Sequence, residues 1–387
     1  MNSHPYDPLS RIESLYLRGN GDSRVVSNNE RQVLAEVWRT PGRSRAAFRT
    51  RLNLAQQSIH RIVTQLEERG MVLLGELVPP ANKGKPSPRL HLNPRFACSV
   101  GVSINTDSAG ICVMDFSGGF TSRSVSIDAL TMDEAIGVTE NEISDLLEAS
   151  GFRWEDVFGI GFAITGFLVE GTRFNAPEPL SEWSAVHLGP VLADRFGKPV
   201  WTENGANTSA LCERMLGVGR RIDNFVYLSF NYGFGGGIIL NGELARGGFG
   251  NAGELSGMFT PEEMGDRPRL RSLLKTLQAG GVDVRTIDDL TQRFDMAWPG
   301  VAEWLDRVSA HYSRVINVLS AVVDPEVIVL GGQIPRQLAK ELMARTKFYE
   351  TPRHGIHRKM PRLHASEIQG ETAAIGAASL PLKEVFF

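Results

Sequence analysis

The stretch SNNERQVLAEVWRTPGRSRAAFRTRLNLAQQSIHRIVTQLEERG, residues 27–70, predicts three consecutive short helices. Ser27 and Glu30 have the capping-box spacing, in which a hydroxyl and a glutamate three residues later each accept a backbone N–H at a helix start. Apolar residues then recur at helical spacing, and Pro41-Gly42 ends the first helix. The pattern indicates a small helical domain near the start of the chain.

Two further helices are expected over about 44–52 and about 55–69. The third has the clearest pattern, because its apolar residues fall on one face and leave a polar face opposite. The apolar face holds Ile59, Ile62, Val63 and Leu66. The polar face holds Gln56, Gln57, His60, Arg61 and Thr64.

Two strands are expected after the third helix, at 71–74 and 89–92. A long Pro- and Gly-rich turn joins them and carries Lys83 and Lys85. Three helices followed by a hairpin are the order of a winged helix-turn-helix. We therefore expect an N-terminal arm at 1–26 and a DNA-binding domain at 27–93.

The charge distribution supports this assignment. Residues 1–95 contain 15 Arg and Lys against 8 Asp and Glu, a net charge of +7. The whole chain carries −3, so the remaining residues carry −10. A basic head on an acidic body is expected when the head meets a polyanion, and double-stranded DNA is the expected partner.

The third helix is the expected reader of DNA, because the N-terminal half of this helix meets base edges in helix-turn-helix proteins. Gln pairs bidentately with adenine and Arg with guanine. Arg45 and Arg49 suit phosphates, and the lysines of the turn suit the minor groove. The alternative is a solvated helix face. The predicted DNA contacts are Arg45, Arg49, Gln56, Gln57, Ser58, His60, Arg61, Thr64, Lys83 and Lys85.

Composition indicates a globular protein of 387 residues with 42% apolar content. No apolar run reaches the roughly 18 residues of a membrane span, and the first 25 residues lack a signal-peptide core, so the cytoplasm is the expected compartment. Cys98, Cys112 and Cys212 are too scattered for a disulfide framework or a metal cluster. We expect them to be apolar fillers.

From about residue 97 the texture changes to short apolar strands, Gly-rich turns and intervening helices, which is typical of an α/β domain. The expected elements are a hairpin over 99–114, strands over 157–164, 225–230 and 237–240, and a long amphipathic helix over 304–323 that runs into a strand at 327–330.

Four segments of this body have the order and spacing of one known family. They are Gly159-Ile160-Gly161-Phe162 with Thr165-Gly166, Glu203-Asn204-Gly205-Ala206-Asn207, 233–237 followed by 246–247 and 250–254, and Asp324-Pro325-Glu326 through Gly331-Gly332. The body thus resembles the bacterial repressors, open reading frames and sugar kinases known as the ROK family.

The resemblance implies a two-lobed, actin-like (ribonuclease H-like) sugar-kinase domain over 94–387 with a sugar cleft. Lobe one is expected at about 94–202 with a C-terminal return at about 368–387, and lobe two at about 203–367. In the repressor branch of the family the implied companion is an N-terminal winged helix.

Departures from the family's kinase pattern decide the expected activity. Its kinases begin with Asp-x-Gly-Gly-Thr, whose glycines let the backbone approach ATP phosphates, and the matching stretch here is Ser103-Ile104-Asn105-Thr106-Asp107. The second phosphate loop, Gly-Thr-Gly-x-Gly, is Asn231-Tyr232-Gly233-Phe234-Gly235. Both changes oppose nucleotide binding.

Gly205 stands where the resemblance places the kinases' catalytic aspartate, which takes the proton from the attacking sugar hydroxyl. Glycine cannot transfer a proton. The family's zinc site needs a His where Gly257 stands and a cysteine run downstream, but residues 259–270 hold no cysteine. We expect no kinase activity, no metal and no cofactor.

Part of the family's sugar site is retained. Asn204 and Glu254 match residues that hydrogen-bond sugar hydroxyls, although Asn204 could instead hold a loop and Glu254 cap the next helix. Trp183 would stack on a sugar ring, although a lone Trp is more often in a core. The predicted effector contacts are Asn204, Glu254, Asn251 and Trp183.

The leading hypothesis is a transcriptional regulator, a repressor of sugar uptake or metabolism genes. A sugar or sugar derivative would close the lobes and change the spacing of the winged helices in a homodimer or homotetramer. Two alternatives stay open. One is an active ROK sugar kinase with a DNA-binding head, and the other is a constitutive DNA-binding regulator with an empty cleft. No membrane partner is expected.

Overall fold

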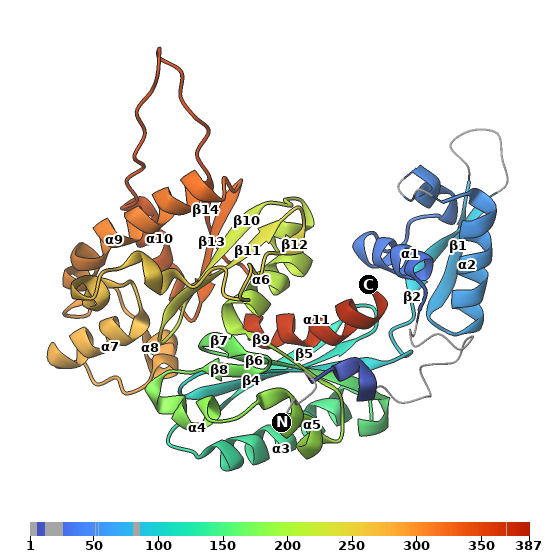
Figure 1. The fold of residues 1–387 in the computed structure, drawn as a ribbon, viewed down its shortest axis with the longest axis horizontal. Coiled ribbons are helices and arrows are strands. Elements are labelled where there is room, and N and C mark those ends of the chain that lie inside the picture. The colour runs from blue at the N-terminus through green and yellow to red at the C-terminus, as the bar shows by residue number, and fades with distance from the viewer. Residues whose placement is uncertain (1–5, 12–25, 51, 53, 80–85, 369) are drawn as a thin grey trace.

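The computed structural model describes residues 6–11, 26–50, 52, 54–79, 86–368 and 370–387. A small N-terminal head lies beside a body of two lobes, each built on a five-stranded sheet (Figure 1). The two-lobed α/β body confirms the predicted fold class.

The head has the predicted order of elements: α1 (Asn28–Arg39), the 3-10 helix η2 (Arg45–Thr50), α2 (Gln56–Glu68), β1 (Val72–Val78) and β2 (Ser87–Leu92). The capping box is present, because Ser27 Oγ accepts the Glu30 N–H at 3.4 Å and Glu30 accepts the Ser27 N–H at 2.7 Å. The helix predicted over about 44–52 is shorter and is a 3-10 helix of six residues, a form that is frequent in short connecting segments.

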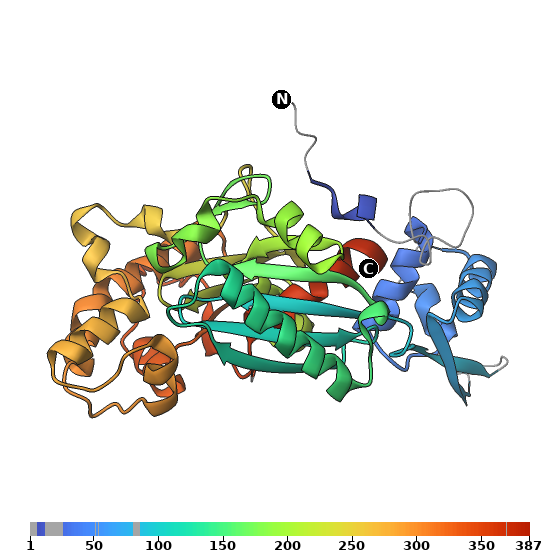
Figure 2. The ribbon, with the colours of Figure 1, turned by 90° about the horizontal axis from the view of Figure 1, so that it is seen from below.

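The first lobe contains a mixed sheet in the order β5 (Phe120–Ser126), β4 (Ser108–Asp115), β3 (Cys98–Ile104), β6 (Val157–Ile164), β9 (Val200–Asn204). Helix α3 (Met132–Ser150) crosses its outer face (Figure 2). The smaller elements of this lobe are η3 (Trp154–Asp156), β7 (Phe167–Glu170), β8 (Arg173–Asn175), η4 (Glu178–Leu180), α4 (Ser181–Ser184) and α5 (Leu188–Phe196).

The second lobe contains a sheet in the order β12 (Glu243–Leu244), β11 (Phe234–Leu240), β10 (Phe225–Phe230), β13 (Val327–Gly332), β14 (Arg362–Ala365). Its other elements are η5 (Val218–Arg220), η6 (Leu255–Met258), η7 (Glu262–Asp266), α7 (Leu270–Ala279), α8 (Ile287–Arg293), α9 (Val301–Val322) and α10 (Arg336–Ala344). The segment between α10 and β14 projects outward as a long loop (Figure 1).

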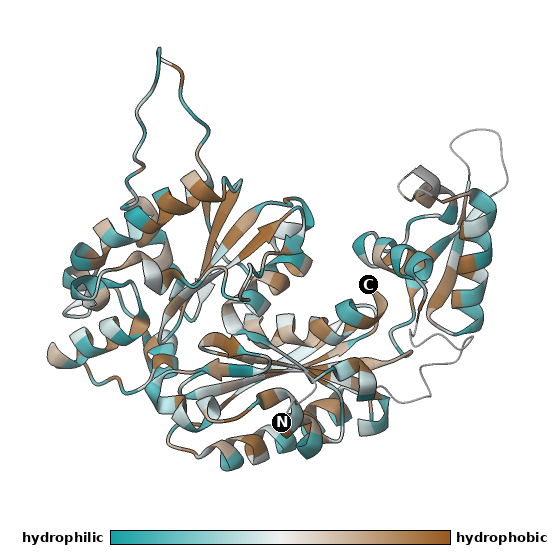
Figure 3. Cartoon of the chain, viewed as in Figure 1, coloured by the Kyte–Doolittle hydropathy of each residue, from teal (hydrophilic) through white to brown (hydrophobic). Residues whose placement is uncertain are grey.

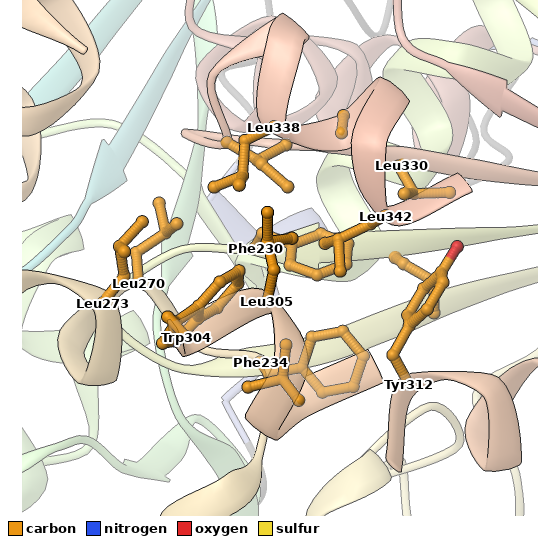
Figure 4. Packing of buried hydrophobic residues seen from close by; sticks show 14 of the residues in the cluster. Phe230, Phe234, Leu270, Leu273, Trp304, Leu305, Tyr312, Leu330, Leu338 and Leu342 are labelled. Atoms are coloured by element: carbon orange, nitrogen blue, oxygen red, sulfur yellow. The ribbon is translucent and has the colours of Figure 1, made fainter. Parts of the chain in front are cut away.

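Apolar strands and helix faces make the core of each lobe, and hydrophobic residues concentrate in the strands (Figure 3). In the second lobe Phe230, Phe234 and Tyr312 pack closely, as Figure 4 shows, with ring centroids 5.0 Å apart for the first pair. Trp304 is fully buried and donates its indole N–H to Ser272 Oγ at 2.8 Å. The lobe therefore has a well-packed core that can position the loops above it.

Two helices connect the lobes. Helix α6 (Gly205–Leu216) packs on β11 and β10, and α11 (Thr372–Phe386) packs on β3 and β6. The helices also pack on each other so closely that a Cβ at Gly376 would lie 1.7 Å from the Thr208 carbonyl oxygen. Only glycine permits this approach. The two helices therefore pack backbone against backbone at this point.

The head packs on the end of α11. The Trp38 and Phe387 rings meet edge to face with centroids 3.9 Å apart. Arg31 donates to the backbone oxygens of Lys383 and Phe387 at 2.9 and 3.0 Å. One apolar cluster runs from Val33 and Leu34 of α1 through Phe116 to Phe386. Head and body thus share a continuous core.

Residues 6–11 lie on the first lobe. The Tyr6 hydroxyl accepts the Val200 N–H at 3.0 Å, and Arg11 pairs with Asp194 at 2.8 Å. Among the described helices, none is long and apolar enough to cross a membrane. Cys98, Cys112 and Cys212 are free and buried, as expected of apolar fillers.

Candidate functional site

A cavity of about 430 Å³ lies between the lobes, lined by residues of both. The first lobe contributes 165–167 and 175–178. The second contributes the start of α6, the β10–β11 turn, and the segments 250–256 and 264–271. Asn204, Asn251 and Glu254, all predicted effector contacts, are in this lining.

Asn204 uses its amide within the protein. Its Oδ1 accepts the Ala206 N–H at 2.7 Å and caps α6, and its Nδ2 donates to the Gly166 carbonyl at 2.5 Å. These are the bonds of the loop-holding alternative. Asn204 nevertheless lines the cavity, so ligand contact by it stays a prediction.

Asn251 connects the lobes across the cavity. Its Oδ1 accepts the Leu168 N–H and its Nδ2 donates to the Leu168 carbonyl, both at 2.8 Å. An amide that pairs with both backbone groups of one residue acts like a neighbouring strand. Asn251 therefore holds the second lobe against β7.

Glu254 is exposed and only partly engaged. Its Oε1 accepts the Ser256 N–H at 3.2 Å and caps η6, which is the capping alternative for this residue. Its second oxygen forms no hydrogen bond with the described residues, and Glu254 lines the cavity. A ligand hydroxyl is the kind of donor that this oxygen can accept.

Trp183 corrects the expected set. It is 3% exposed, packs face to face on Phe162 at a centroid distance of 5.8 Å, and belongs to the first-lobe core. It is absent from the cavity lining within the described part of the chain. The prediction that Trp183 stacks on a sugar is therefore wrong, because its ring is packed in the core beneath α4.

The segment 103–107, which the resemblance aligns with the kinases' first phosphate loop, connects the two lobes. Asp107, buried at 6% exposure, accepts the N–H groups of Ile287 and Asp288 at 2.6 and 3.2 Å. It thus caps α8 of the opposite lobe. Asp107 therefore joins the lobes at the turn that the family resemblance aligns with the kinases' first phosphate loop.

Burial raises the pKa of the Asp107 carboxyl above its usual 3.8. The hydrogen bonds from Ile287 and Asp288 lower this pKa, but the effect of burial is larger. The folded chain therefore binds this proton more tightly than the unfolded chain does. Its contribution to stability is then largest below 3.8 and falls as pH rises through the raised pKa. Asp107→Asn keeps an acceptor without the charge, so its stability relative to wild type should rise as pH rises above 3.8 and through the raised pKa. Thermal melts across that range check this, and parallel profiles would contradict it.

The second phosphate loop is filled by side chains. The Tyr232 ring lies under the Arg271 guanidinium, 4.9 Å from its centre, and faces the cavity. Phe234 is buried in the second-lobe core. The loop therefore presents an aromatic ring where a phosphate cradle needs bare backbone.

Gly205 begins α6 at the cavity, and its missing side chain leaves open space. A Cβ there would meet no heavy atom closer than 3.8 Å, the Ile164 carbonyl oxygen. The backbone thus allows an aspartate at this position, and only the sequence excludes one.

Gly205→Asp should fold normally, with a free energy of unfolding equal to wild type or higher by up to about 1 kcal/mol, because Asp suits a helix N-terminus better than Gly. It should not turn over ATP with any sugar, because Asp107 and Tyr232 still occupy the phosphate loops. A coupled ATPase assay with a sugar panel measures this. Sugar-dependent turnover by the variant would show that the filled loops do not prevent nucleotide binding.

An ion pair anchors the segment where the family's zinc site would lie. Arg314 donates two hydrogen bonds of 2.8 and 2.7 Å to the Glu263 carboxylate and a third, of 3.0 Å, to the Met258 carbonyl. This pairing lowers the pKa of Glu263 to about 2. Gly257 is exposed nearby, and the described residues contain no cluster of three His, Cys, Asp or Glu side chains suited to a metal.

The head presents a polar face on α2. Its apolar side is buried as predicted, with Ile59, Ile62, Val63 and Leu66 at most 3% exposed. The opposite side is exposed at Gln56, Gln57, His60 and Arg61, with Ser58 and Thr64 partly covered.

The remaining predicted DNA contacts have different outcomes. Arg45 lies 2.7 Å from His60 Nδ1, so these two basic side chains form one surface. Thr64 Oγ1 donates to the His60 carbonyl. The structure describes Arg49 only as backbone of η2. Lys83 and Lys85 lie outside the described residues.

Sequence reasoning missed three cavity residues, Arg267, Arg269 and Arg271. They come from the region noted only for lacking cysteines. The alternation Arg-Pro-Arg-Leu-Arg was the available signal, since it predicts three cations on one side of an extended segment.

Comparisons with known proteins agree with this architecture. Residues 99–267 match the model of the ROK family. The chain is 27% identical over 243 residues to the xylose repressor of Bacillus subtilis strain 168, covering 60% of this chain and 61% of that protein. It is 36% identical over 195 residues to a beta-glucoside kinase of Listeria monocytogenes, covering 46% and 65%.

Among solved structures, the fold is similar to that of a ROK family transcriptional regulator, a homologue of the E. coli MLC protein. The TM-score is 0.66 at 19% identity, and the match covers 92% of this chain and 96% of that one. The shared fold thus includes the head as well as the body. Together with the family match, these findings show that the chain contains a ROK family domain.

Proposed function

We propose that the chain is a sugar-responsive DNA-binding regulator, a repressor, whose ROK domain holds a ligand without phosphorylating it. The observation that carries this proposal is an exposed, polar α2 face on a winged helix packed onto the body. Similarity to a xylose repressor supports the same assignment.

The DNA-binding part rests on the chemistry of α2. Glutamine and arginine at its N-terminal half can read base edges, and Arg45 beside His60 adds positive charge. Glu67 and Glu68 lie at the other end of the helix. This charge gradient favours insertion of the N-terminal half into a major groove.

The absence of catalysis rests on three positions. Gly205 offers no base, Asp107 places negative charge at the first phosphate loop, and Tyr232 fills the second. Each removes a different requirement of phosphoryl transfer, so restoring one does not restore the reaction. We infer that the domain senses its ligand and is not an enzyme.

Ligand binding can reach the head through α6 and α11. Helix α6 begins at the cavity and packs backbone to backbone on α11, whose last residues contact Trp38 of the head. A ligand that favours one lobe arrangement would shift the position of α2. In a homodimer or homotetramer on a two-fold operator, that shift changes the spacing of the recognition helices.

The test combines three measurements on the full chain. DNA binding is titrated on a fragment selected by the chain from a random library, with and without sugars and their derivatives. Ligand binding is followed by thermal shift, where ligand at 100 times its Kd adds about 2.7 kcal/mol. ATP turnover is assayed in parallel. Ligand-dependent DNA affinity without turnover supports the proposal, whereas turnover indicates a kinase and unaltered DNA affinity indicates a constitutive regulator.

A further inference from the structure

Three arginines from one short segment face the cavity. Arg267 and Arg269 lie in the link between η7 and α7, Arg271 lies in the first turn of α7, and the residues between them, Pro268 and Leu270, are buried. The buried pair anchors the segment, and all three arginines line the cavity. The result is a cluster of three positive charges at one wall of the cleft.

These arginines form no close ion pair, although the charge of Glu254 acts on Arg267 and raises its pKa against the effect of burial. Across the described part of the chain, none of the three forms an ion pair within 4.0 Å, whereas Arg246 and Arg314 pair with Glu203 and Glu263. Arg267 has one long bond, from Nε to the Met264 carbonyl at 3.4 Å. The Arg269 Nε is buried without any acceptor. Unpaired donors in a cavity wall indicate a site that an external acceptor completes.

The pKa shifts of two of these arginines also favour an anion at this wall of the cavity. Burial lowers the pKa of both Arg267 and Arg269, and the positive charges of Arg267 and Arg271 lower that of Arg269 further. Helix α7 begins at Leu270, so the positive end of its dipole lies at the same wall. An anion placed here relieves the repulsion between the cations and accepts their free N–H groups.

Two other residues of the cavity lining have different chemistry. Asn204 and Glu254 offer an amide and a partly free carboxylate, which suit neutral hydroxyls, and Glu254 is near enough to Arg267 for its charge to act on it. One cavity of about 430 Å³ therefore joins groups suited to hydroxyls to a cluster of cations. This size accommodates a monosaccharide with one charged substituent.

We propose that the cleft binds an anionic sugar derivative, with its hydroxyls toward Asn204 and Glu254 and its anionic group on Arg267, Arg269 and Arg271. The inference rests on the proposed function, because it defines the ligand of the same sensor. A sugar phosphate and a sugar acid share this chemistry. Guanidinium groups bind either anion with paired, charge-assisted hydrogen bonds.

Matched probes test the inference on the full chain. Glucose, mannose and N-acetylglucosamine are each compared with their 6-phosphates, and glucose and galactose with glucuronate and galacturonate, by calorimetry at fixed salt. Inorganic phosphate and ATP serve as anions without the sugar or with the wrong shape. At least one anionic probe should bind with an affinity about tenfold or more above that of its neutral parent. It should also bind more tightly than phosphate or ATP. Whether phosphates or uronates prevail identifies the anion.

Two variants locate the anion. Arg269→Gln and Arg271→Gln should each weaken the anionic probe by about tenfold or more and leave the neutral parent unchanged. Arg285→Gln is the matched control, since this arginine is 87% exposed and lines no part of the cavity. Should Arg269→Gln fold poorly, the salt dependence of wild-type binding replaces it, because affinity for the anionic probe alone should fall as salt rises.

The outcomes separate this inference from the proposed function. If neutral sugars bind as tightly as their anionic derivatives and both glutamine variants match wild type, the anionic subsite is wrong while the sugar sensor stands. If only ATP or inorganic phosphate binds, the proposed contacts of sugar hydroxyls with Asn204 and Glu254 are wrong. If no probe binds at all, both the sensor and the subsite are overturned.

Discussion

Phe386→Ala should lower the free energy of unfolding by about 3–5 kcal/mol, because it empties a buried site that the surroundings cannot refill. Phe386 is fully buried, and its ring centroid lies 5.0 Å from that of Phe116 and 5.1 Å from that of Phe158. All three rings belong to the same apolar cluster as residues of the head helices. Urea unfolding followed by tryptophan fluorescence measures the loss.

Phe249→Ala is the matched control, because this phenylalanine is 91% exposed. The same substitution there should change stability by no more than about 0.5 kcal/mol. Equal losses in the two variants would mean that the cluster around α11 is not the stabilising core that joins head and body. A separate early unfolding step of the head in Phe386→Ala would locate the loss at their junction.

The double variant Gln57→Ala/Arg61→Ala should weaken binding to the selected DNA fragment by about 30-fold or more, since each lost base contact costs about 1–3 kcal/mol. Both side chains are exposed on the face of α2 opposite its buried stripe. Their removal should leave the melting temperature nearly unchanged. Fluorescence anisotropy at fixed salt measures the affinity.

A control at the other end of the same helix distinguishes reading of DNA from general charge. Glu67→Ala/Glu68→Ala changes two exposed residues and raises the net charge of the head. Binding should stay within about threefold of wild type or tighten slightly. If this pair weakens binding as much as the Gln57/Arg61 pair does, α2 does not enter the groove by its N-terminal half.

The prominence of α11 suggests how the two ends of the molecule influence each other. Its middle packs against α6 without room for a Cβ at Gly376, and its last residues lie under α1. Close-packed interiors transmit strain. In the proposed function, a shift of α6 by a ligand would therefore be passed through α11 to the head.

Local patterns predicted the head well. The start of α1 followed from Ser27 and Glu30, because a capping box depends on residues three positions apart. The buried side of α2 followed from helical periodicity. The 3-10 form of 45–50 did not follow, since packing against neighbouring elements decides such a short segment.

What the sequence by itself determined is the order of elements in the head, the glycine at position 205 and the lack of cysteine in 259–270, because each depends on residue identity or on neighbours a few positions away. Tertiary structure alone decided that Asp107 caps α8, 180 positions away, and that Asn251 holds Leu168, 83 positions away. It also placed Trp183 in the core and left the Arg269 Nε without an acceptor among the described residues. These outcomes depend on how distant segments pack and exclude water, which local spacing does not encode.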